Sequence, residues 1–294
     1  MRHIFIVNPA AGKRQAPLGF IPIIEKRFDG GDFEIYLTKG GGDASEFVRK
    51  TAQSGEPSRF YSCGGDGTLS EVASGAYGFE NAEVACVPLG SGNDFIKTFG
   101  GAERFLDIDS QVRAEAMPID LIRAGDRIAI NICSMGLDAE VGANQSRFKR
   151  LPLVSGPMAY NMSLAYCFFK KVRHRFEICI DEHEPICGEF IFALAGNARY
   201  YGGGFCGAPE AVPNDGLLDF VLVGAVSRPR ILGLISKFKA GRILEEADIC
   251  QFYRGKRMTV KAETPSAINA DGECVIQTEE TFEVIPNGLR FVVP

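Results

Sequence analysis

The stretch Phe60–Thr68 reads FYSCGGDGT, a β-prone run that ends in three glycines interleaved with an aspartate and a threonine. Glycine has no Cβ, so the chain can turn sharply there and a phosphate can approach the backbone closely. Residues 69–73 read as the start of a helix, and helix N–H groups at such a turn point toward an anion. The pattern predicts a loop that binds nucleotide phosphates, with an ordinary strand-to-helix turn as the alternative.

Asp66 lies inside this loop and gives it a particular chemistry. A carboxylate there can meet a metal ion, a ribose or a transferring phosphate, but it repels a phosphate whose charge is not compensated. The loop also lacks the lysine of a P-loop. A cation must therefore come from Mg²⁺ or from elsewhere in the fold.

The composition limits the classes of protein. The chain has 294 residues, 46% of them apolar, which fits a soluble globular protein of one large or two ordinary domains. A net charge of −5 argues against nucleic acid as the main partner. The three histidines leave little material for a zinc site or a Ser-His-Asp hydrolase.

The cysteines and the lengths of the apolar runs indicate the cellular compartment of the protein. Nine cysteines lie scattered without a Cys-x-x-Cys pair, which favours reduced thiols and a cytoplasmic protein. The first apolar run, Ile4–Val7, is too short for a signal peptide and reads as a strand. No apolar run approaches the roughly 18–20 residues of a membrane-spanning helix. We therefore expect a cytoplasmic protein that is not integral to a membrane.

Strands and helices alternate over the first 120 residues or so. Ligands of the parallel sheet that this predicts, covered by helices on both faces, lie beyond the carboxyl ends of the strands. Three loops should meet there: Asn8–Lys13, Gly64–Thr68 and Gly90–Asp94. The expected strands are Ile4–Val7, Phe33–Leu37, Arg59–Ser62 and Ala85–Val87, and the expected helices are Phe20–Phe28, Ala44–Ala52 and one from about Leu69.

The pattern changes after about Pro118, where short turns join successive strands. These expected strands are Ile119–Arg123, Arg127–Cys133, Phe176–Ile180, Glu189–Ala195, Leu218–Val223, Met258–Ala262 and Thr281–Val284, with two helices near Pro157–Phe169 and Pro229–Lys239. We predict an α/β protein in which residues 1–118 form a three-layer α/β/α nucleotide-binding domain. Residues 119–294 should form an antiparallel, β-sandwich-like domain, with a cleft between the two.

The motifs form an ordered set. The first half carries NPAAGK at residues 8–13, GGDGT at 64–68 and GSGNDF at 90–95. The second half carries GLDAEV at 136–141, YGGG at 201–204 with Ala-Pro at 208–209, NDGLLD at 214–219 and DGE at 271–273. The set resembles the diacylglycerol kinase catalytic-domain family, to which bacterial soluble lipid kinases and eukaryotic sphingosine kinases belong. It spans nearly the whole chain, whereas a lone GGDG is shared with NAD kinases and phosphofructokinases.

The resemblance implies that ATP lies on the loops of the first domain and the lipid headgroup in the cleft. ATP contacts carry over by position to Asn8, Thr38, the loop Gly65–Glu71 and Ser91. The candidate nucleotide-site residues are Asn8, Pro9, Gly12, Lys13, Thr38, Gly64, Gly65, Asp66, Gly67, Thr68, Glu71, Ser91, Asn93 and Asp94.

The resemblance also implies a general base and a structural metal ion. The family's base lies in the 271–273 motif, as Asp271 or Glu273. In the sphingosine kinase branch the residue that matches Asp66 is taken as the base. The resemblance implies Mg²⁺ near Asp215, with the backbone carbonyl groups of Val212 and Leu217 completing its site.

Three departures from the family pattern affect these expectations. Ser91 stands where threonine is common and keeps the hydroxyl group, whereas Ser70 replaces an asparagine and puts that contact in question. The chain also ends at Val292–Pro294, where many bacterial members add a segment that returns to the first domain. We therefore expect looser closure of the two domains.

Several site residues have simpler readings. Asp271 and Glu273 flank a glycine, as in a plain hairpin turn, and Asp215 lies in an equally ordinary turn sequence. Lys13 reads as a phosphate contact or as a solvated lysine. Taken alone, Asp271 and Glu273 favour the turn, and the family resemblance reverses that. The resemblance also favours the metal at Asp215, whereas the two readings of Lys13 stay open.

Two stretches mix aromatic and basic residues, Arg147–Leu151 and Phe168–Arg175. Peripheral enzymes use this combination on anionic lipid. The alternative is a helix end with core phenylalanines and a solvated basic face. By contrast, the spacing in Arg230–Arg242 favours a packed helix. Transient contact with the inner face of the membrane is one expectation that follows.

The function indicated is an ATP- and Mg²⁺-dependent lipid kinase with diacylglycerol as the expected acceptor. An NAD kinase shares the glycine loop and the two-domain plan, although GSGNDF and DGE speak against it. A catalytically silent lipid- or nucleotide-binding protein is the alternative from another class. The sequence leaves the oligomeric state open, with a homodimer among the options.

Overall fold

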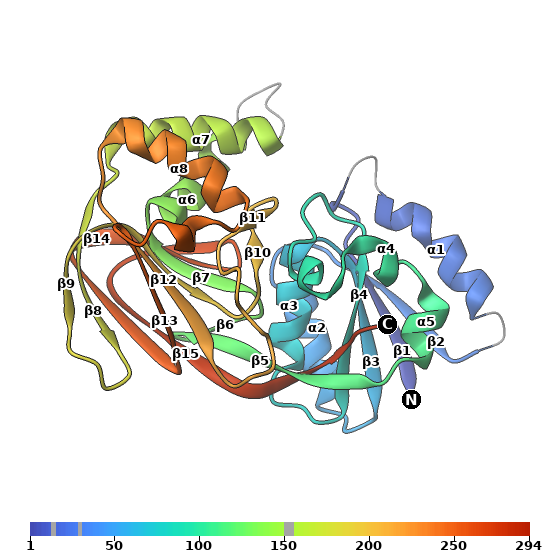
Figure 1. The fold of residues 1–294 in the computed structure, drawn as a ribbon. Helices are drawn as coiled ribbons and strands as arrows, with labels where there is room; N and C mark the ends of the chain where they lie inside the picture. Colours follow the sequence, from blue (N-terminus) through green and yellow to red (C-terminus); the bar gives the residue numbers. More distant parts are fainter. Residues whose placement is uncertain (13–15, 29–30, 150–155) are drawn as a thin grey trace.

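Figure 1 shows the computed structural model, which describes residues 1–12, 16–28, 31–149 and 156–294. The N-terminal lobe alternates strands with helices along the chain. Its elements are β1 (Arg2–Val7), α1 (Ala16–Arg27), β2 (Phe33–Leu37), α2 (Asp43–Ala52), β3 (Ser58–Gly64), α3 (Asp66–Ala76), β4 (Ala82–Pro88), the 3₁₀-helix η1 (Phe95–Phe99), α4 (Ala102–Phe105) and α5 (Ile108–Arg113).

The strands of this lobe pair in parallel in the order β4–β3–β1–β2. Side chains of β1 alternate between the two faces of the sheet. Ile4 and Ile6 share a core with residues of α2 and α3, whereas Phe5 and Val7 share a core with residues of α1 and α5. A parallel sheet needs both faces covered, and the three-layer α/β/α arrangement in Figure 1 provides this.

The C-terminal lobe is mostly antiparallel and β-sandwich-like. Its elements are β5 (Ala116–Ala124), β6 (Arg127–Ala129), β7 (Ile132–Gly136), α6 (Leu137–Lys149), α7 (Gly156–Lys170), β8 (His174–Ile180), β9 (Ile186–Gly196), β10 (Tyr200–Tyr201), β11 (Phe205–Cys206), β12 (Leu218–Gly224), α8 (Arg228–Lys239), the 3₁₀-helix η2 (Ile243–Glu245), β13 (Cys250–Gly255), β14 (Arg257–Ala270) and β15 (Glu273–Val292). Apolar residues of α6, α7 and α8 pack on one face of the strands, as in Val141, Leu234 and Val221.

The last strand, β15, joins the two lobes. It pairs antiparallel with β5, and near its end Arg290 and Phe291 pair in parallel with β4 of the first lobe. Phe291 is fully buried against Phe95 and Phe105. The expectation that the chain lacks a segment returning to the first lobe is therefore wrong. The strand continues well past the predicted Thr281–Val284 and reaches that lobe itself.

Two other elements differ from the sequence-based expectation. The strand expected at Arg127–Cys133 is divided into β6 and β7, because the N–H groups of Ile130 and Asn131 donate to Asp271. Helix α6 was not predicted. Its apolar residues include Leu137, Ala139 and Val141, whose spacing of two is also that of a strand.

Within the described residues, no helix has both the length and the apolar character that crossing a bilayer requires.

Candidate active site

The three predicted loops meet at the carboxyl edge of the parallel sheet. Asn8 donates from Nδ2 to Thr68 Oγ1 at 3.0 Å, which ties the first loop to the second. A Cβ on Gly12 would lie 2.2 Å from the carbonyl oxygen of Leu89, and a Cβ on Gly90 would lie 2.2 Å from Gly65 Cα. These close approaches need glycine at positions 12 and 90, and they confirm the prediction that the loops converge.

The glycine loop leads directly into α3. Gly64 must be glycine, since a Cβ there would lie 2.3 Å from Thr68 Oγ1. Gly65 precedes the first helical residue, Asp66, and no side chain among the described residues caps this helix start. The exposed Gly67 lies in the first turn. Backbone N–H groups at such a start are available to an anion.

The third loop holds the side chain of Asp66. Asp66 Oδ1 accepts hydrogen bonds from the N–H groups of Asp94, at 2.5 Å, and Phe95, at 3.4 Å. Gly92 leaves room for the carboxylate, because a Cβ there would lie 2.4 Å from Asp66 Oδ2. Asn93 has a φ of 49° and closes the loop by donating to the carbonyl of Gly90.

The remaining nucleotide-site candidates flank these loops. Thr38 follows β2, is buried and donates its N–H to the carbonyl of Val7, so it stands beside the first loop. Glu71, on α3, accepts from the N–H of Ala44 at 3.3 Å. Pro9 lies in the first loop and Ser91 is exposed in the third. Lys13 lies outside the described residues.

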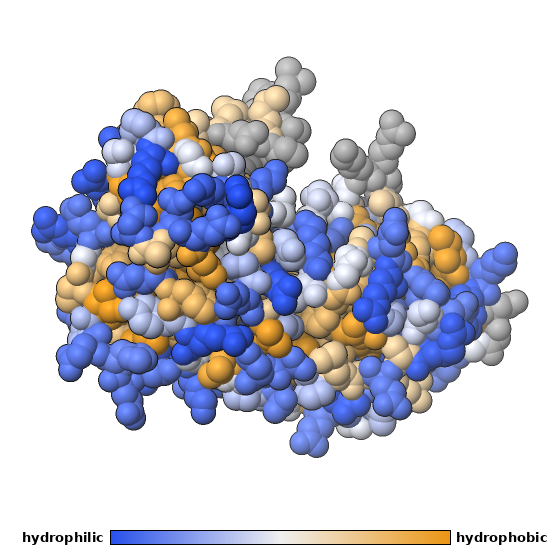
Figure 2. Space-filling view, in the orientation of Figure 1, coloured by the Kyte–Doolittle hydropathy of each residue, from blue (hydrophilic) through white to orange (hydrophobic). Residues whose placement is uncertain are grey.

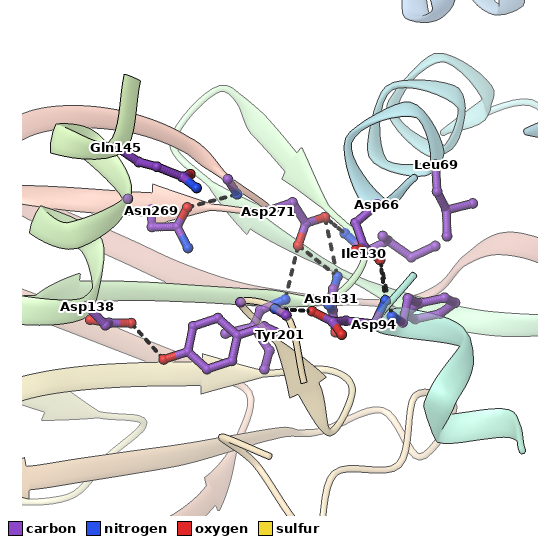
Figure 3. Close-up of a pocket in the computed structure, with 16 residues that line it drawn as sticks. Asp66, Leu69, Asp94, Ile130, Asn131, Asp138, Gln145, Tyr201, Asn269 and Asp271 are labelled. Atoms are coloured by element: carbon purple, nitrogen blue, oxygen red, sulfur yellow. Dashed lines mark hydrogen bonds between the residues drawn. The ribbon is translucent and has the colours of Figure 1, made fainter. Parts of the chain in front are cut away.

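A cavity of about 250 Å³ opens where these loops face the second lobe. Four carboxyl groups line it: Asp66 and Asp94 from the first lobe, and Asp138 and Asp271 from the second. Figure 3 shows them around one space, with Asn131, Asn269 and Gln145 on its other walls. The arrangement brings Asp66 and Asp271 together, which the sequence left as two separate candidates.

Asp271 is held by the backbone of the stretch between β6 and β7. Its carboxylate accepts from the N–H groups of Ile130 at 2.6 Å, Asn131 at 3.1 Å and Ile132 at 3.0 Å. Asp271, with a φ of 48°, and Gly272 form the two-residue turn between β14 and β15. The plain hairpin reading is thus confirmed for this residue, which also lines the cavity.

Burial and neighbouring charge shift the pKa values of both aspartates. Burial raises the pKa of Asp66 to about 6, and the nearby carboxylates of Asp94 and Asp271 add to the rise. Burial also raises the pKa of Asp271, but hydrogen bonds from Ile130 and Ile132 and from the Ser70 side chain oppose it. The Ser70 side chain of the first lobe thus acts on Asp271 of the second, and the family contact in question at this position stays a prediction.

Glu273 lies elsewhere. It is exposed and lines a separate hollow together with Ser70, Glu71 and Arg127, on the α2 and α3 side of the hairpin. The two carboxylates that the sequence could not separate therefore lie in different environments, and only Asp271 lines the same cavity as Asp66.

A second, apolar cavity of about 90 Å³ lies next to the acidic one. It is lined by side chains of α6, α7, α8 and the strands beneath them, including Val141, Phe192, Leu234 and Phe238. Apart from Asp271, sequence reasoning did not single out the residues that the second lobe contributes to the two cavities. The GLDAEV and YGGG motifs supplied the resemblance, but no local pattern indicated that Asp138 and Tyr201 face one another.

The turn at Asp215 is the metal site that the resemblance implies. Asp215 Oδ1 accepts from the N–H of Leu217 at 3.0 Å, and Oδ2 binds the Arg254 guanidinium at 2.8 Å. The carbonyl of Val212 accepts from the N–H of Asn214. Both carboxylate oxygens are thus engaged, and the described residues contain no cluster of three or more His, Cys, Asp or Glu arranged for a metal. The carboxylate of Asp215 is thus bound by groups of the chain itself, and Mg²⁺ here stays a prediction.

Comparison with known proteins defines the class and then the family. The diacylglycerol kinase catalytic domain matches residues 2–124, and the YegS C-terminal NAD kinase beta sandwich-like domain matches residues 131–293. A probable lipid kinase YegS-like from Pseudomonas aeruginosa is 30% identical over 92% of this chain and 88% of its own. One from Alcanivorax borkumensis is 28% identical over 92% and 90%. The chain belongs to the diacylglycerol kinase catalytic-domain family, in the branch with a YegS-type C-terminal domain.

Solved structures share the fold. A putative diacylglycerol kinase from Bacillus anthracis superposes with a TM-score of 0.75 at 21% identity, covering 100% of this chain and 97% of that one. An NAD kinase from Archaeoglobus fulgidus in complex with ATP gives a TM-score of 0.54 at 14% identity, covering 99% and 93%. The two-lobed architecture is therefore common to both kinds of kinase.

Proposed function

We propose that this chain transfers the γ-phosphate of ATP to a hydroxyl group of a lipid. Residues 1–118 would supply the nucleotide loops and residues 119–294 the lipid cavity. The observation that carries the proposal is the position of Asp66, on the loop that is built for phosphate, at the wall of a cavity that continues toward an apolar one. A kinase for a lipid alcohol needs a phosphate-binding loop, a carboxylate beside it and an apolar cavity close to both.

The phosphates of ATP would lie on the backbone of the three loops. The uncapped start of α3 offers N–H groups, and the exposed Gly67 in its first turn has open space in which a phosphate can approach the backbone. Thr38 and Glu71 stand at the flank of the loops, where the nucleoside would extend. When bound with ATP, Mg²⁺ would neutralise phosphate charge beside Asp66 and Asp94, and we assign it no further role.

Asp66 is the base that the geometry supports. With a pKa of about 6 it is ionised at neutral pH yet basic enough to accept the proton of a lipid hydroxyl. Asp271 instead has its oxygens occupied by three backbone N–H groups. We therefore assign Asp271 to fixing the cavity wall. Glu273 remains the alternative base and is tested beside Asp66.

The acceptor side supports a lipid with an uncharged or cationic headgroup. Four carboxyl groups line the cavity and repel an anionic headgroup, while the adjacent apolar cavity suits a hydrocarbon chain. Diacylglycerol, which gives phosphatidic acid, is the acceptor that the family resemblance implies.

The surface around α7 and α8 supports contact with a membrane. Phe169 at the end of α7 is 77% exposed and Leu232 on α8 is 59% exposed. Arg228 donates to the carbonyl of Phe168, which places these two helix ends together. Figure 2 shows apolar and charged side chains mixed on the lobe that carries these helices. Exposed Lys170 and Arg173 would add about 1 kcal/mol each on an anionic cytoplasmic leaflet.

Other predicted basic segments are packed. Arg147 lies over the ring of Tyr166 at 5.7 Å, and Phe148 packs on the same ring. Residues 150–151 of that stretch lie outside the described residues. Helix α8 buries Ile231 and Leu234, which confirms the packed helix expected over Arg230–Arg242.

The proposal is tested with purified protein, Mg²⁺ and labelled ATP in mixed micelles that contain diacylglycerol or another neutral lipid. Labelled phosphate should appear in a lipid product, and its mass identifies the acceptor. The variants Asp66→Asn, Glu273→Gln and the surface control Asp109→Asn distinguish the two bases. Failure to label any lipid would reject the proposal, and formation of NADP⁺ from NAD⁺ would assign the chain to the other kinase that shares its fold.

A further inference from the structure

Two side chains, joined by a hydrogen bond, lie between the acidic cavity and the apolar one. Among the described residues that line either cavity, Asp138 and Tyr201 are the two that line both. Tyr201 donates from its hydroxyl group to Asp138 Oδ2 at 3.1 Å, as Figure 3 shows. Asp138 lies at the start of α6 and Tyr201 at the end of β10, so the bond spans the passage from opposite walls.

The apolar cavity is too small for a lipid chain as it stands. Its volume of about 90 Å³ equals that of only about three water molecules. The ring of Tyr201 stands between it and the space of about 250 Å³ beside Asp66. A chain whose headgroup lies near Asp66 therefore passes Tyr201 on its way to the apolar cavity.

Glycines surround Tyr201 and make a movement of its ring inexpensive. Gly202, Gly203 and Gly204 follow it with φ values of 60°, 84° and 102°. The ring also lies over Gly207, where a Cβ would come within 2.7 Å of it. Gly203 donates its N–H to Asp94 Oδ2 at 2.7 Å, so this segment is tied to the third nucleotide loop.

Movement of Tyr201 removes a hydrogen bond from a buried carboxyl group. Asp138 Oδ1 is already buried without a hydrogen-bond partner among the described residues, and Oδ2 loses one when the Tyr201 hydroxyl leaves. Lys97, near the same glycines, is paired with Asp94. A hydroxyl or ammonium group of the lipid, close to the hydroxyl that reacts, would supply the partner.

We propose that the Tyr201 hydroxyl holds the place of a second polar group of the acceptor, and that Asp138 selects lipids that carry one. On binding, the non-reacting hydroxyl of the lipid donates to Asp138, and the Tyr201 ring turns aside and opens the apolar cavity to the chain. The inference rests on the proposed lipid kinase activity and narrows its acceptor. Single-chain lipids with two neighbouring donor groups should be better acceptors than diacylglycerol, whose glycerol has one free hydroxyl.

The test compares two lipids that differ in one group: a 1-O-alkylglycerol, with two free hydroxyls, and its 2-deoxy analogue. The wild-type protein should prefer the diol in kcat/KM by roughly tenfold to a hundredfold, the range for a hydrogen bond to an ionised group. Asp138→Ala should reduce this preference to near one, through KM more than kcat, and Asp138→Asn should leave an intermediate value. Glu140→Gln, on the same helix, is the matched control and should keep the wild-type preference.

Tyr201→Phe should act in the opposite direction. It removes the hydroxyl that the lipid must displace, so KM for the diol should fall while kcat stays unchanged. If Asp138→Ala does not fold, the ratio measured for Asp138→Asn decides. Equal use of the diol and its deoxy analogue by the wild-type protein overturns this inference and leaves the kinase proposal standing, as does an unchanged preference in the folded Asp138 variants. Transfer to neither lipid nor to diacylglycerol overturns both.

Discussion

The nucleotide wall and the acceptor wall of the candidate site differ in whether backbone or side-chain atoms form them. On the nucleotide side, the closest approach between loops is backbone against backbone, where Gly90 meets Gly65. On the acceptor side, the walls are side chains such as Tyr201, Phe192 and Leu234, which come from separate strands and helices. Backbone contacts leave no side chain to exchange, whereas side-chain walls can be reshaped one residue at a time. A fold of this kind can keep its nucleotide site while its acceptor changes.

Asp66 is the side chain on which the nucleotide wall depends, and its replacement should have the largest effect. We expect Asp66→Asn to lower kcat by about 10²–10⁴-fold, because the lipid hydroxyl loses its base. In the wild-type protein, kcat/KM should fall as the pH drops below the Asp66 pKa of about 6. A pH–rate profile of both proteins checks this. If Glu273→Gln abolishes activity while Asp66→Asn does not, the base has been assigned to the wrong carboxylate.

The same variant should change stability in the opposite sense. The folded state raises the pKa of Asp66 from 3.8 to about 6, so the folded protein binds this proton more tightly than the unfolded chain. That contribution to stability is present at acid pH and is lost as the pH rises through 6. Asp66→Asn should therefore be more stable than wild type at pH 8, by at most about 3 kcal/mol, and no different at pH 3.5. Urea unfolding at the two pH values measures it.

A methyl group on the backbone wall should be the next most damaging change. Gly90→Ala forces a Cβ against Gly65 Cα, and we expect a loss of about 2–3 kcal/mol in the free energy of unfolding and about a hundredfold in kcat/KM. Gly233→Ala on α8 is the control, since a Cβ there meets no atom within 4 Å. It should stabilise the helix by about 0.5–1 kcal/mol. Thermal unfolding and ATP turnover distinguish the two, and a tolerated Gly90→Ala would show that the loops do not need their close approach.

The side-chain wall should instead change its selectivity. Leu234 is buried and lines the apolar cavity, so Leu234→Ala should shift the preferred acyl chain to a longer one, with a loss of about 2–4 kcal/mol in stability. Leu232→Ala, on the exposed face of the same helix, should change neither property by more than about 0.5 kcal/mol. The measurement is kcat/KM over a series of chain lengths. The same chain preference in both variants would place the hydrocarbon chain elsewhere.

The smallest effect is expected where the two walls touch. Ser70 on α3 supports Asp271 from the first lobe, and Ser70→Ala should reduce stability by about 0.5–1.5 kcal/mol and activity only a few-fold. Ser74→Ala, one turn further along α3, is the control. A loss of activity as large as that of Asp66→Asn would give Asp271 a direct part in the reaction.

The sequence predicted the backbone-built nucleotide wall better than the acceptor wall, which is built of side chains from distant segments. Gly64, Gly65 and Gly90 act through local backbone geometry, so their spacing alone indicated a phosphate loop. The hydrogen bond between Asp138 and Tyr201 depends on strand pairings between distant parts of the chain. No local sequence pattern near either residue predicts it. Asp271 and Glu273 are two positions apart, and only the turn between β14 and β15 decides which of them enters the cavity. The break between β6 and β7 likewise depends on a carboxylate about 140 residues later, the separation between Asn131 and Asp271.

The pairing of β5 with β15 has a consequence for how a lipid could enter. The polypeptide passes between the lobes twice, and the two passages are zipped together as an antiparallel ribbon whose last residues extend the sheet of the other lobe. Such a ribbon bends far less readily than a pair of free linkers. Wide opening of the two lobes is therefore disfavoured, and a substrate that enters the cavity between them must do so without a large separation of the lobes.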